Sequence, residues 1–174
     1  MTVNDSIERG IGRVRPARMQ EIDRVAALWT LITEHHAGLD PLFRMRRGHV
    51  AEGELRELLR GLARDPDAAI LVYDGSGETE AEAAQIDGIV IVRIDHAPAI
   101  MEETERGEIT DLGVRPEHRR KGIARLLAGE AMDWARDRGV ERVEIQVASG
   151  NVEGQAFWRA LGYTDLMDVL HKRL

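Results

Sequence analysis

The sequence contains no cysteine. This absence excludes disulfide bonds, thiolate metal ligands and a cysteine nucleophile, and it is typical of proteins kept in a reducing compartment. We therefore expect a cytoplasmic protein whose chemistry depends on other residue types.

Aromatic residues are also scarce, at 4% of the chain, and the formal net charge is −7. Domains that bind nucleic acids favour a basic surface and aromatic stacking platforms, so we expect no nucleic-acid partner. No stretch approaches the roughly 18 apolar residues of a membrane span, and no apolar segment typical of a signal peptide follows Met1. The six histidines form no His-Glu-x-x-His run, so neither a membrane nor a metal is expected.

What is present is an ordinary globular composition, with 43% hydrophobic and 32% charged residues. A chain of 174 residues is most simply one domain with a sizeable core. The first residues are polar and show no pattern. We therefore predict a flexible N-terminal tail over 1–12 and a single domain over 13–174.

Hydrophobic periodicity predicts a mixture of strands and helices. A chain of this order folds as an α/β or α+β protein with helices layered on a sheet. The expected strands are a short one within 13–18 that stops at Pro16, then 68–73, 86–94, 108–114, 141–147 and 165–174. The expected helices are 19–36, 49–64, 121–138 and 152–161.

One of these helices begins against the usual charge rule. The positive N-terminus of a helix favours Asp or Glu, yet this one opens with Arg119, Arg120 and Lys121. Gly122 and Ala124 leave the backbone N–H groups accessible, which suits a phosphate. The spacing is neither a Walker loop nor a dinucleotide fingerprint. The alternative interpretation is a solvated basic turn.

Two blocks of sequence favour the phosphate interpretation. VRPEHRRKGIA (114–124) resembles the Arg/Gln-x-x-Gly-x-Gly/Ala signature of the GNAT N-acyltransferases, which bind acetyl-CoA. NVEGQAFWRALGY (151–163) is similar to the family's Asn…Phe-Tyr-x-x-Leu-Gly-Phe segment. The resemblance implies the GNAT fold: a mostly antiparallel mixed sheet, splayed between the strands at 108–114 and 141–147, with helices on both faces.

The resemblance also implies residues that bind coenzyme A. Backbone N–H groups of the turn and first helical turn would hold the pyrophosphate, and the preceding strand would align the pantetheine arm. The N–H of Val114 would also stabilise the oxyanion. Asn151 is a helix N-cap, a contact to the cofactor arm, or both. The pyrophosphate residues are Arg119, Arg120, Lys121, Gly122, Ile123 and Ala124, and the pantetheine residues are Leu112, Gly113 and Val114.

Acylation of an amine needs a base, and a desolvated carboxylate can take that role. Glu108 matches the position where several family members place the base, and Asp111 is the second candidate. A strand bulge would aim either one inward. Glu108 could also be an ordinary exposed strand-end residue. The acidic run that contains Glu108 (101–108) is either a solvated loop or, beside the site, an attractant for a cationic amine.

The sequence departs from the family's pattern at Trp158. A tyrosine often stands there and is assigned as the acid that protonates the departing thiolate, whereas an indole N–H cannot give up a proton at neutral pH. We expect Trp158 to form a wall of the cofactor channel. Tyr163 stands where the family usually has Phe. It either packs in the core or is the displaced acid.

The first hypothesis is therefore an enzyme that moves an acetyl group from acetyl-CoA directly to a primary amine. The acceptor, a small molecule or a peptide, is not identified by the sequence. The alternative is a non-catalytic sensor that binds acyl-CoA. A nucleic-acid binder that uses the 115–125 cluster is a third, disfavoured hypothesis, and homodimerisation stays open.

Overall fold

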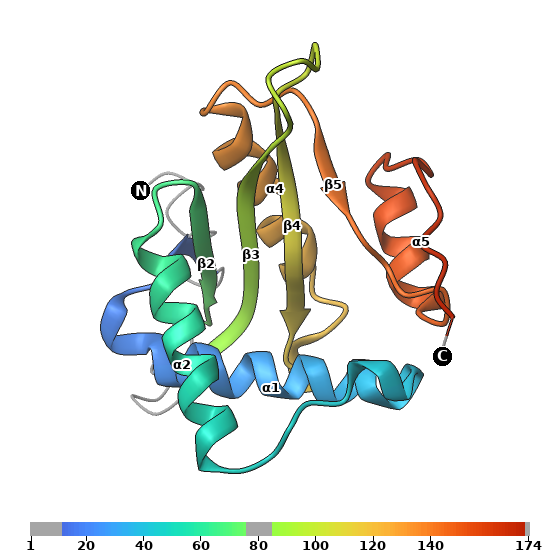
Figure 1. Cartoon of the computed structure of the whole chain (residues 1–174). Helices are drawn as coiled ribbons and strands as arrows, with labels where there is room; N and C mark the ends of the chain where they lie inside the picture. Colours follow the sequence, from blue (N-terminus) through green and yellow to red (C-terminus); the bar gives the residue numbers. More distant parts are fainter. Residues whose placement is uncertain (1–11, 76–84, 173–174) are drawn as a thin grey trace, which may run out of the picture.

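The computed structural model describes residues 12–75 and 85–172 (Figure 1). The tail predicted over 1–12 lies outside the described residues except for Gly12. The strands are β1 (Arg13–Pro16), β2 (Ala68–Asp74), β3 (Ile86–His96), β4 (Glu105–Val114) and β5 (Val143–Ile145), and the helices are α1 (Ile22–Leu39), α2 (His49–Arg64), α4 (Ile123–Arg136) and α5 (Val152–Ala160).

Local sequence signals explain where several helices begin and end. α2 stops at Arg64 because Asp65 precedes a proline and is extended, which disfavours a further helical turn. α5 begins at Asn151, whose side chain accepts a hydrogen bond from Gly154 N at 2.9 Å. The predicted N-cap is therefore confirmed.

The five strands form one sheet in the order β1-β2-β3-β4-β5. All neighbours are antiparallel except β4 and β5, which are parallel. β5 pairs only with Gly107–Ile109, so the two strands diverge over the second half of β4. Figure 1 shows this divergence, with α5 beyond it. The predicted splayed, mostly antiparallel mixed sheet is confirmed.

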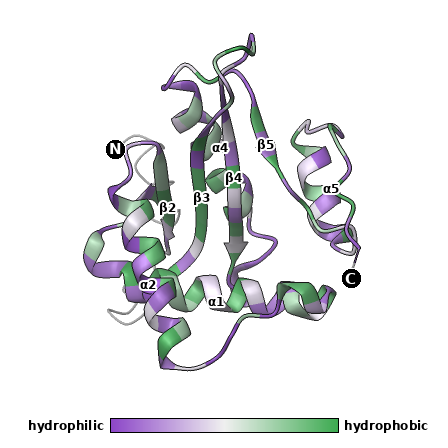
Figure 2. Ribbon diagram, viewed as in Figure 1, coloured by the Kyte–Doolittle hydropathy of each residue, from purple (hydrophilic) through white to green (hydrophobic). Residues whose placement is uncertain are grey.

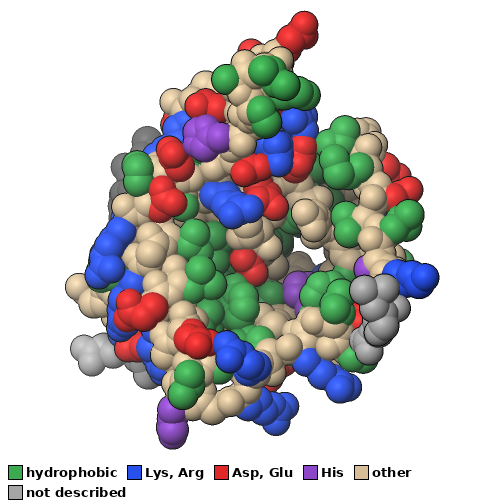
Figure 3. Space-filling model, viewed as in Figure 1, with side chains coloured by type: hydrophobic (Ala, Val, Ile, Leu, Met, Phe, Trp, Pro, Cys, Tyr) green, Lys and Arg blue, Asp and Glu red, His purple; other side chains and the backbone are tan. Residues whose placement is uncertain are grey.

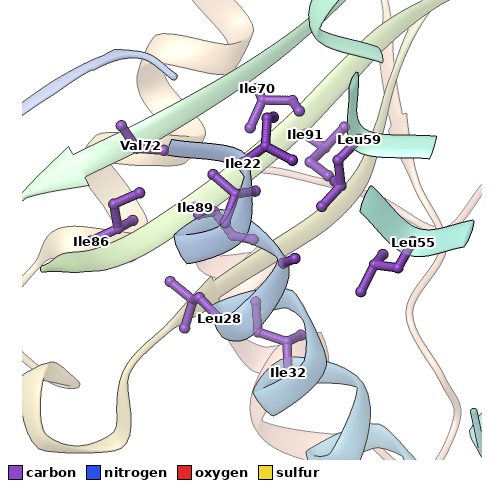
Figure 4. Packing of buried hydrophobic residues seen from close by; sticks show 12 residues of the cluster. Ile22, Leu28, Ile32, Leu55, Leu59, Ile70, Val72, Ile86, Ile89 and Ile91 are labelled. Atoms are coloured by element: carbon purple, nitrogen blue, oxygen red, sulfur yellow. The ribbon is translucent and has the colours of Figure 1, made fainter. Parts of the chain in front are cut away.

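Helices cover both faces of the sheet. In Figure 2, β2 and β3 are largely hydrophobic, whereas the helices carry both kinds of residue. On one face α1 and α2 pack against β2 and β3, as Figure 4 shows for Ile32, Leu59 and Ile91; we call this the α1-side core. On the other face, α4 and α5 pack against the strand residues that alternate with those of the α1-side core. We call this cluster the α4-side core, and it is made of Leu71, Tyr73, Val90, Val92, Ile109, Val114, Ile123, Leu127, Ala128, Ala131 and Trp158.

One predicted element is wrong. Residues 164–172 form neither a strand nor a helix, although a final strand is predicted over 165–174. The start of the segment is held to α5 by an ion pair between Arg159 Nη2 and Asp165 Oδ1 at 2.8 Å. Its apolar residues lie at positions 166, 167, 169 and 170, so they do not alternate and cannot share one face of a strand. They are 63–91% exposed.

Candidate active site

A bulge in β4 shapes the middle of the sheet. Ile91 pairs with Asp111 and Val92 pairs with Ile109, so Thr110 is an extra residue on β4. Without it, the three-residue spacing would place Glu108 and Asp111 on opposite faces. With it, Glu108 lies opposite Arg93 and Asp111 opposite Ile91, both on the face covered by α1.

Glu108 forms an ion pair with a residue of the neighbouring strand. Arg93 donates to it from both Nε, at 2.7 Å from Glu108 Oε2, and Nη2, at 2.5 Å. Sequence reasoning missed Arg93, because its approach to Glu108 depends on the register of β3 against β4.

Asp111 is in a different environment. Burial raises the pKa of its carboxyl, against the opposing effects of hydrogen bonds from Thr110 and Trp29 and of the nearby His36. Thr110 Oγ1 lies 2.8 Å from Asp111 Oδ2. No arginine or lysine forms an ion pair with this carboxylate within the described residues. Desolvation that outweighs these opposing effects raises the pKa of a carboxyl, as a carboxylate base requires.

His36 and Trp29 come from α1. Burial lowers the pKa of the His36 ring and the adjacent His35 lowers it further, while Asp111 raises it. The His36 ring packs against Phe43, with 5.9 Å between ring centroids. Nothing in the sequence pattern singles out these α1 residues as neighbours of Asp111, because the contact depends on how the helix crosses the sheet.

The end of β4 presents backbone groups to the gap beside β5. Arg115 N donates to Asp87 O at 2.8 Å, which makes this a hydrogen-bonded pair of the β3–β4 ladder. Since such pairs alternate, Gly113 also bonds to β3, whereas the N–H and C=O of Leu112 and Val114 point away from β3, toward the gap. Leu112 and Val114 can therefore align a bound chain.

Gly113 differs from these two neighbours. Its backbone faces Ile89, and a Cβ at this position would overlap the side chain of Ile32 on α1. Because Gly113 has no side chain, α1 can lie close to β4 beside the site.

The turn over 119–124 has the geometry of an anion-binding site, and we call it the cradle. Arg120 and Gly122 have φ of 63° and 84°, so two left-handed residues curl the backbone before α4. The described residues provide no acceptor for the N–H groups of Arg120, Lys121, Gly122, Ile123 and Ala124. Nothing lies within 4 Å of where a Gly122 Cβ would be. Free N–H groups at a helix start form a site for phosphate.

The basic residues of the cradle differ in their contacts. Arg120 and Lys121 are exposed and form no ion pair within the described residues. Arg119 instead turns back, and its Nε lies 3.3 Å from Val114 O. The arginine thus ties the turn to the end of β4, while the other two remain available to an anion.

The remaining predicted residues lie in the α4-side core. Trp158 is 5% exposed and packs edge-on against Phe157 and Tyr163, each with 5.0 Å between ring centroids. Burial raises the pKa of the Tyr163 phenol. Trp158 is therefore a core residue, and its role as a wall of the cofactor channel stays a prediction.

The acidic run does not lie beside the cradle. Glu102 and Glu103 are at the β3–β4 hairpin, about 30 Å of strand from Val114. Glu103 accepts from Arg142 Nε at 2.9 Å. The hairpin also lines a surface depression with Ile100 and Met101. The start of the run therefore lies far from the cradle, whereas its last residue, Glu108, shares a face of β4 with Asp111. That the run attracts a cationic amine stays a prediction.

Neither a metal cluster nor a membrane-spanning helix is found among the described residues. No group of three or more His, Cys, Asp or Glu residues is arranged to hold a metal ion there. None of the described helices is both long and apolar enough to span a membrane.

Comparison with known proteins relates this geometry to one family. Residues 36–163 match the family described as Acetyltransferase (GNAT) family. A stretch of 96 residues is 32% identical to streptothricin acetyltransferase from Streptomyces lavendulae. The match covers 52% of this chain and 51% of the relative. The chain spans about half the length or less of the curated relatives it matches.

Solved structures share the fold. The tetramutant of the BH1408 protein from Bacillus halodurans has a TM-score of 0.76 at 21% identity, covering 93% of this chain and 99% of that one. The aminoglycoside N-acetyltransferase AAC(6')-Iy in complex with CoA has a TM-score of 0.71 at 15% identity, covering 95% of each chain.

Acetyl-CoA is the cosubstrate of this family, and the residues present fit it. Among the described residues, the cradle has N–H groups without an acceptor, left-handed backbone and two cations without an ion pair, all of which suit a pyrophosphate. The gap between β4 and β5 opens directly from the cradle, and Figure 3 shows an opening between the body of the molecule and the lobe that contains α5. The chain belongs to the GNAT family of acetyltransferases.

Proposed function

We propose that this chain transfers the acetyl group of acetyl-CoA directly to a primary amine. The observation that carries the proposal is that the cradle and the free edge of β4 adjoin each other. The N–H groups of 120–124 provide anion donors, and Leu112 and Val114 provide strand-like partners for the adjoining arm. Acetyl-CoA supplies an activated acyl group when it lies along this path.

In this proposal Asp111 is the base. Its carboxyl is desolvated and forms no ion pair with an arginine or lysine of the described residues, which supports proton uptake from an amine. Glu108 ranks second, because Arg93 already holds its carboxylate in an ion pair. The Val114 N–H faces the gap and would stabilise the negative charge that develops on the acyl oxygen.

The acceptor would enter on the α1 face. Trp29 and His36 flank Asp111 there, so the site combines one carboxylate with an aromatic and an imidazole ring. The curated relatives are named for streptothricin and mycothiol, and several of the structural neighbours for aminoglycosides. We infer a small-molecule amine as the acceptor.

The test is release of free thiol from acetyl-CoA with a panel of amines: streptothricin, aminoglycosides, polyamines, amino acids and peptides. Acetyl-CoA should first raise the melting temperature, by an amount set by the ratio of its concentration to Kd. Turnover with one amine class supports the proposal. Tight binding of acetyl-CoA without turnover of any amine would favour the acyl-CoA sensor, and absence of binding would refute both.

A further inference from the structure

The charges on the α1 face of β4 limit what an acceptor can present there. Of the two carboxylates on this face, Glu108 already forms an ion pair with Arg93, whereas Asp111 has no arginine or lysine partner among the described residues. Burial and the adjacent His35 lower the pKa of His36, so this ring beside Asp111 is neutral at pH 7. An acceptor that enters here therefore meets one carboxylate, which suits one amino group better than several.

Ring and aliphatic surfaces border this carboxylate. The indole of Trp29 hydrogen-bonds to Asp111, and the ring of His36 packs against Phe43, with 5.9 Å between ring centroids. Phe43 and the neighbouring Leu42 are themselves exposed. Exposed aromatic and aliphatic side chains next to a desolvated carboxylate suit the apolar body of a ligand.

The linker between α1 and α2, residues 40–48, brings arginines next to these rings. Arg44 directly follows Phe43, so their Cα atoms are about 3.8 Å apart, and Arg47 lies three residues further on. Figure 1 shows the linker at the lower edge of the molecule, and Figure 3 shows Lys and Arg side chains gathered there. The chain thus passes from the carboxylate through the rings to a basic segment.

Two of the linker's arginines are available to a ligand. Arg44 and Arg47 are exposed and form no ion pair within the described residues, whereas Arg46 is paired with a glutamate of α2. The carboxylate of the linker, Asp40, accepts a hydrogen bond from the backbone N–H of Leu42 at 2.7 Å. Arginines without an acidic partner attract an anion and repel a second cation.

We propose that the acceptor is a primary amine on an apolar or aromatic body that also carries an anionic group, and that polycations are poor acceptors. This inference rests on the proposed acetyl transfer and names the acceptor class of the same site. The amino group would lie at Asp111, the body against the rings of His36 and Phe43, and the anionic group at Arg44 or Arg47. The inference separates this chain's acceptor from the aminoglycosides, which carry several amino groups.

The first experiment compares three acceptors that share one scaffold: phenethylamine, its para-carboxylate and its para-aminomethyl derivative. Thiol release from saturating acetyl-CoA gives kcat/KM for each, with an aminoglycoside and spermidine measured alongside. We expect the carboxylate to exceed phenethylamine by about fivefold, the upper range of an exposed ion pair, and the diamine and both polycations to fall below phenethylamine. The advantage of the carboxylate should shrink at high salt.

The opposite order of these acceptors would overturn the inference. A diamine or polycation that is turned over faster than the carboxylate shows that the site selects additional cations. If all three phenethylamines are inert, amino acids compared with polyamines and aminoglycosides decide in the same way. Failure of every amine, with acetyl-CoA bound, would instead refute the proposed function and this inference with it.

The second experiment compares Arg44→Gln and Arg47→Gln with Arg64→Gln. Arg64 is exposed at the last residue of α2, roughly 24 Å along the helix from the linker, and forms no ion pair within the described residues. Each linker variant should raise KM for the carboxylate about threefold, with kcat and the KM for phenethylamine unchanged. The double linker variant should lose the preference for the carboxylate, whereas Arg64→Gln should keep it. A preference that survives in the double variant, or that falls equally in Arg64→Gln, would overturn the inference.

Discussion

Arg93 and Glu108 face each other across β3 and β4 and form an ion pair, with Arg93 Nε 2.7 Å from Glu108 Oε2. The guanidinium compensates the carboxylate that sequence resemblance ranks first as the base. Asp111, three residues along, has no such partner among the described residues. The two carboxylates share a face of the sheet, so their neighbours rather than their positions distinguish them.

We therefore expect Asp111→Asn to be the more damaging of two matched substitutions. It should lower kcat by about 10²–10⁴-fold, because the base is removed, with little effect on acetyl-CoA binding. Glu108→Gln should change kcat by less than about threefold. Steady-state kinetics with any acetylated amine decides between them, and the opposite order of effects would assign the base to Glu108.

The rate should depend on pH through the same carboxyl. Because burial raises the pKa of Asp111, kcat/KM should rise as the pH passes through that raised value, where the carboxyl becomes an ionised acceptor. In Asp111→Asn the acidic limb of the profile should flatten. A limb that survives unchanged in this variant would belong to another group.

Stability should show the opposite dependence. The folded state binds the Asp111 proton more tightly than the unfolded chain, since its pKa is raised. The stabilisation is complete below the unfolded pKa, near 3.9, and is lost as the pH rises through the folded pKa. At neutral pH Asp111→Asn should therefore raise the melting temperature relative to the unsubstituted protein, and thermal scans at pH 4 and 7 should show that its advantage grows with pH. Glu108→Gln, which breaks an ion pair, should show no such gain.

The parts of the site that were predictable from sequence are local. The turn over 119–124 and the Asn151 cap depend on residues near one another in the chain, so their residue types and spacing are diagnostic. The Arg93–Glu108 pair and the Thr110 bulge depend on strand register, which hydrophobic alternation alone does not specify. Trp29 and His36 reach Asp111 only through the crossing of α1 over β4. The prediction of a final strand was wrong because its apolar residues have strand propensity but do not alternate as packing on one face requires.

Arg120 has a left-handed backbone that is unfavourable for a residue with a side chain. A non-glycine residue at φ 63° is strained by about 1 kcal/mol or more, because Cβ approaches the following carbonyl oxygen. Arg120→Gly should remove that strain and raise the melting temperature of the ligand-free protein. It should also weaken acetyl-CoA binding, since an unpaired cation beside the cradle is lost. Calorimetry at two salt concentrations checks the second effect, and a binding loss that does not shrink at higher salt would contradict the electrostatic explanation.

Gly122 and Gly139 provide a matched test of the cradle. Both have left-handed backbone, with φ of 84° and 78°, and neither has an atom within 4 Å of an added Cβ. They lie at opposite ends of α4, so only Gly122 borders the free N–H groups. Leucine at either position should therefore cause a similar loss of stability, about 1 kcal/mol, through backbone strain alone. The melting temperature should fall by about 2–4 °C in both variants.

Acetyl-CoA should separate the two variants. In Gly139→Leu the ligand should raise the melting temperature as much as in the unsubstituted protein, because the strain lies at the far end of the helix. In Gly122→Leu the side chain would occupy the space for the pyrophosphate, and the ligand-induced rise should disappear. The comparison subtracts the backbone effect, so the difference in ligand response reports on the cradle. Full acetyl-CoA affinity in Gly122→Leu would place the pyrophosphate elsewhere, and a lost response in both variants would mean that strain in α4, rather than steric exclusion, weakens binding.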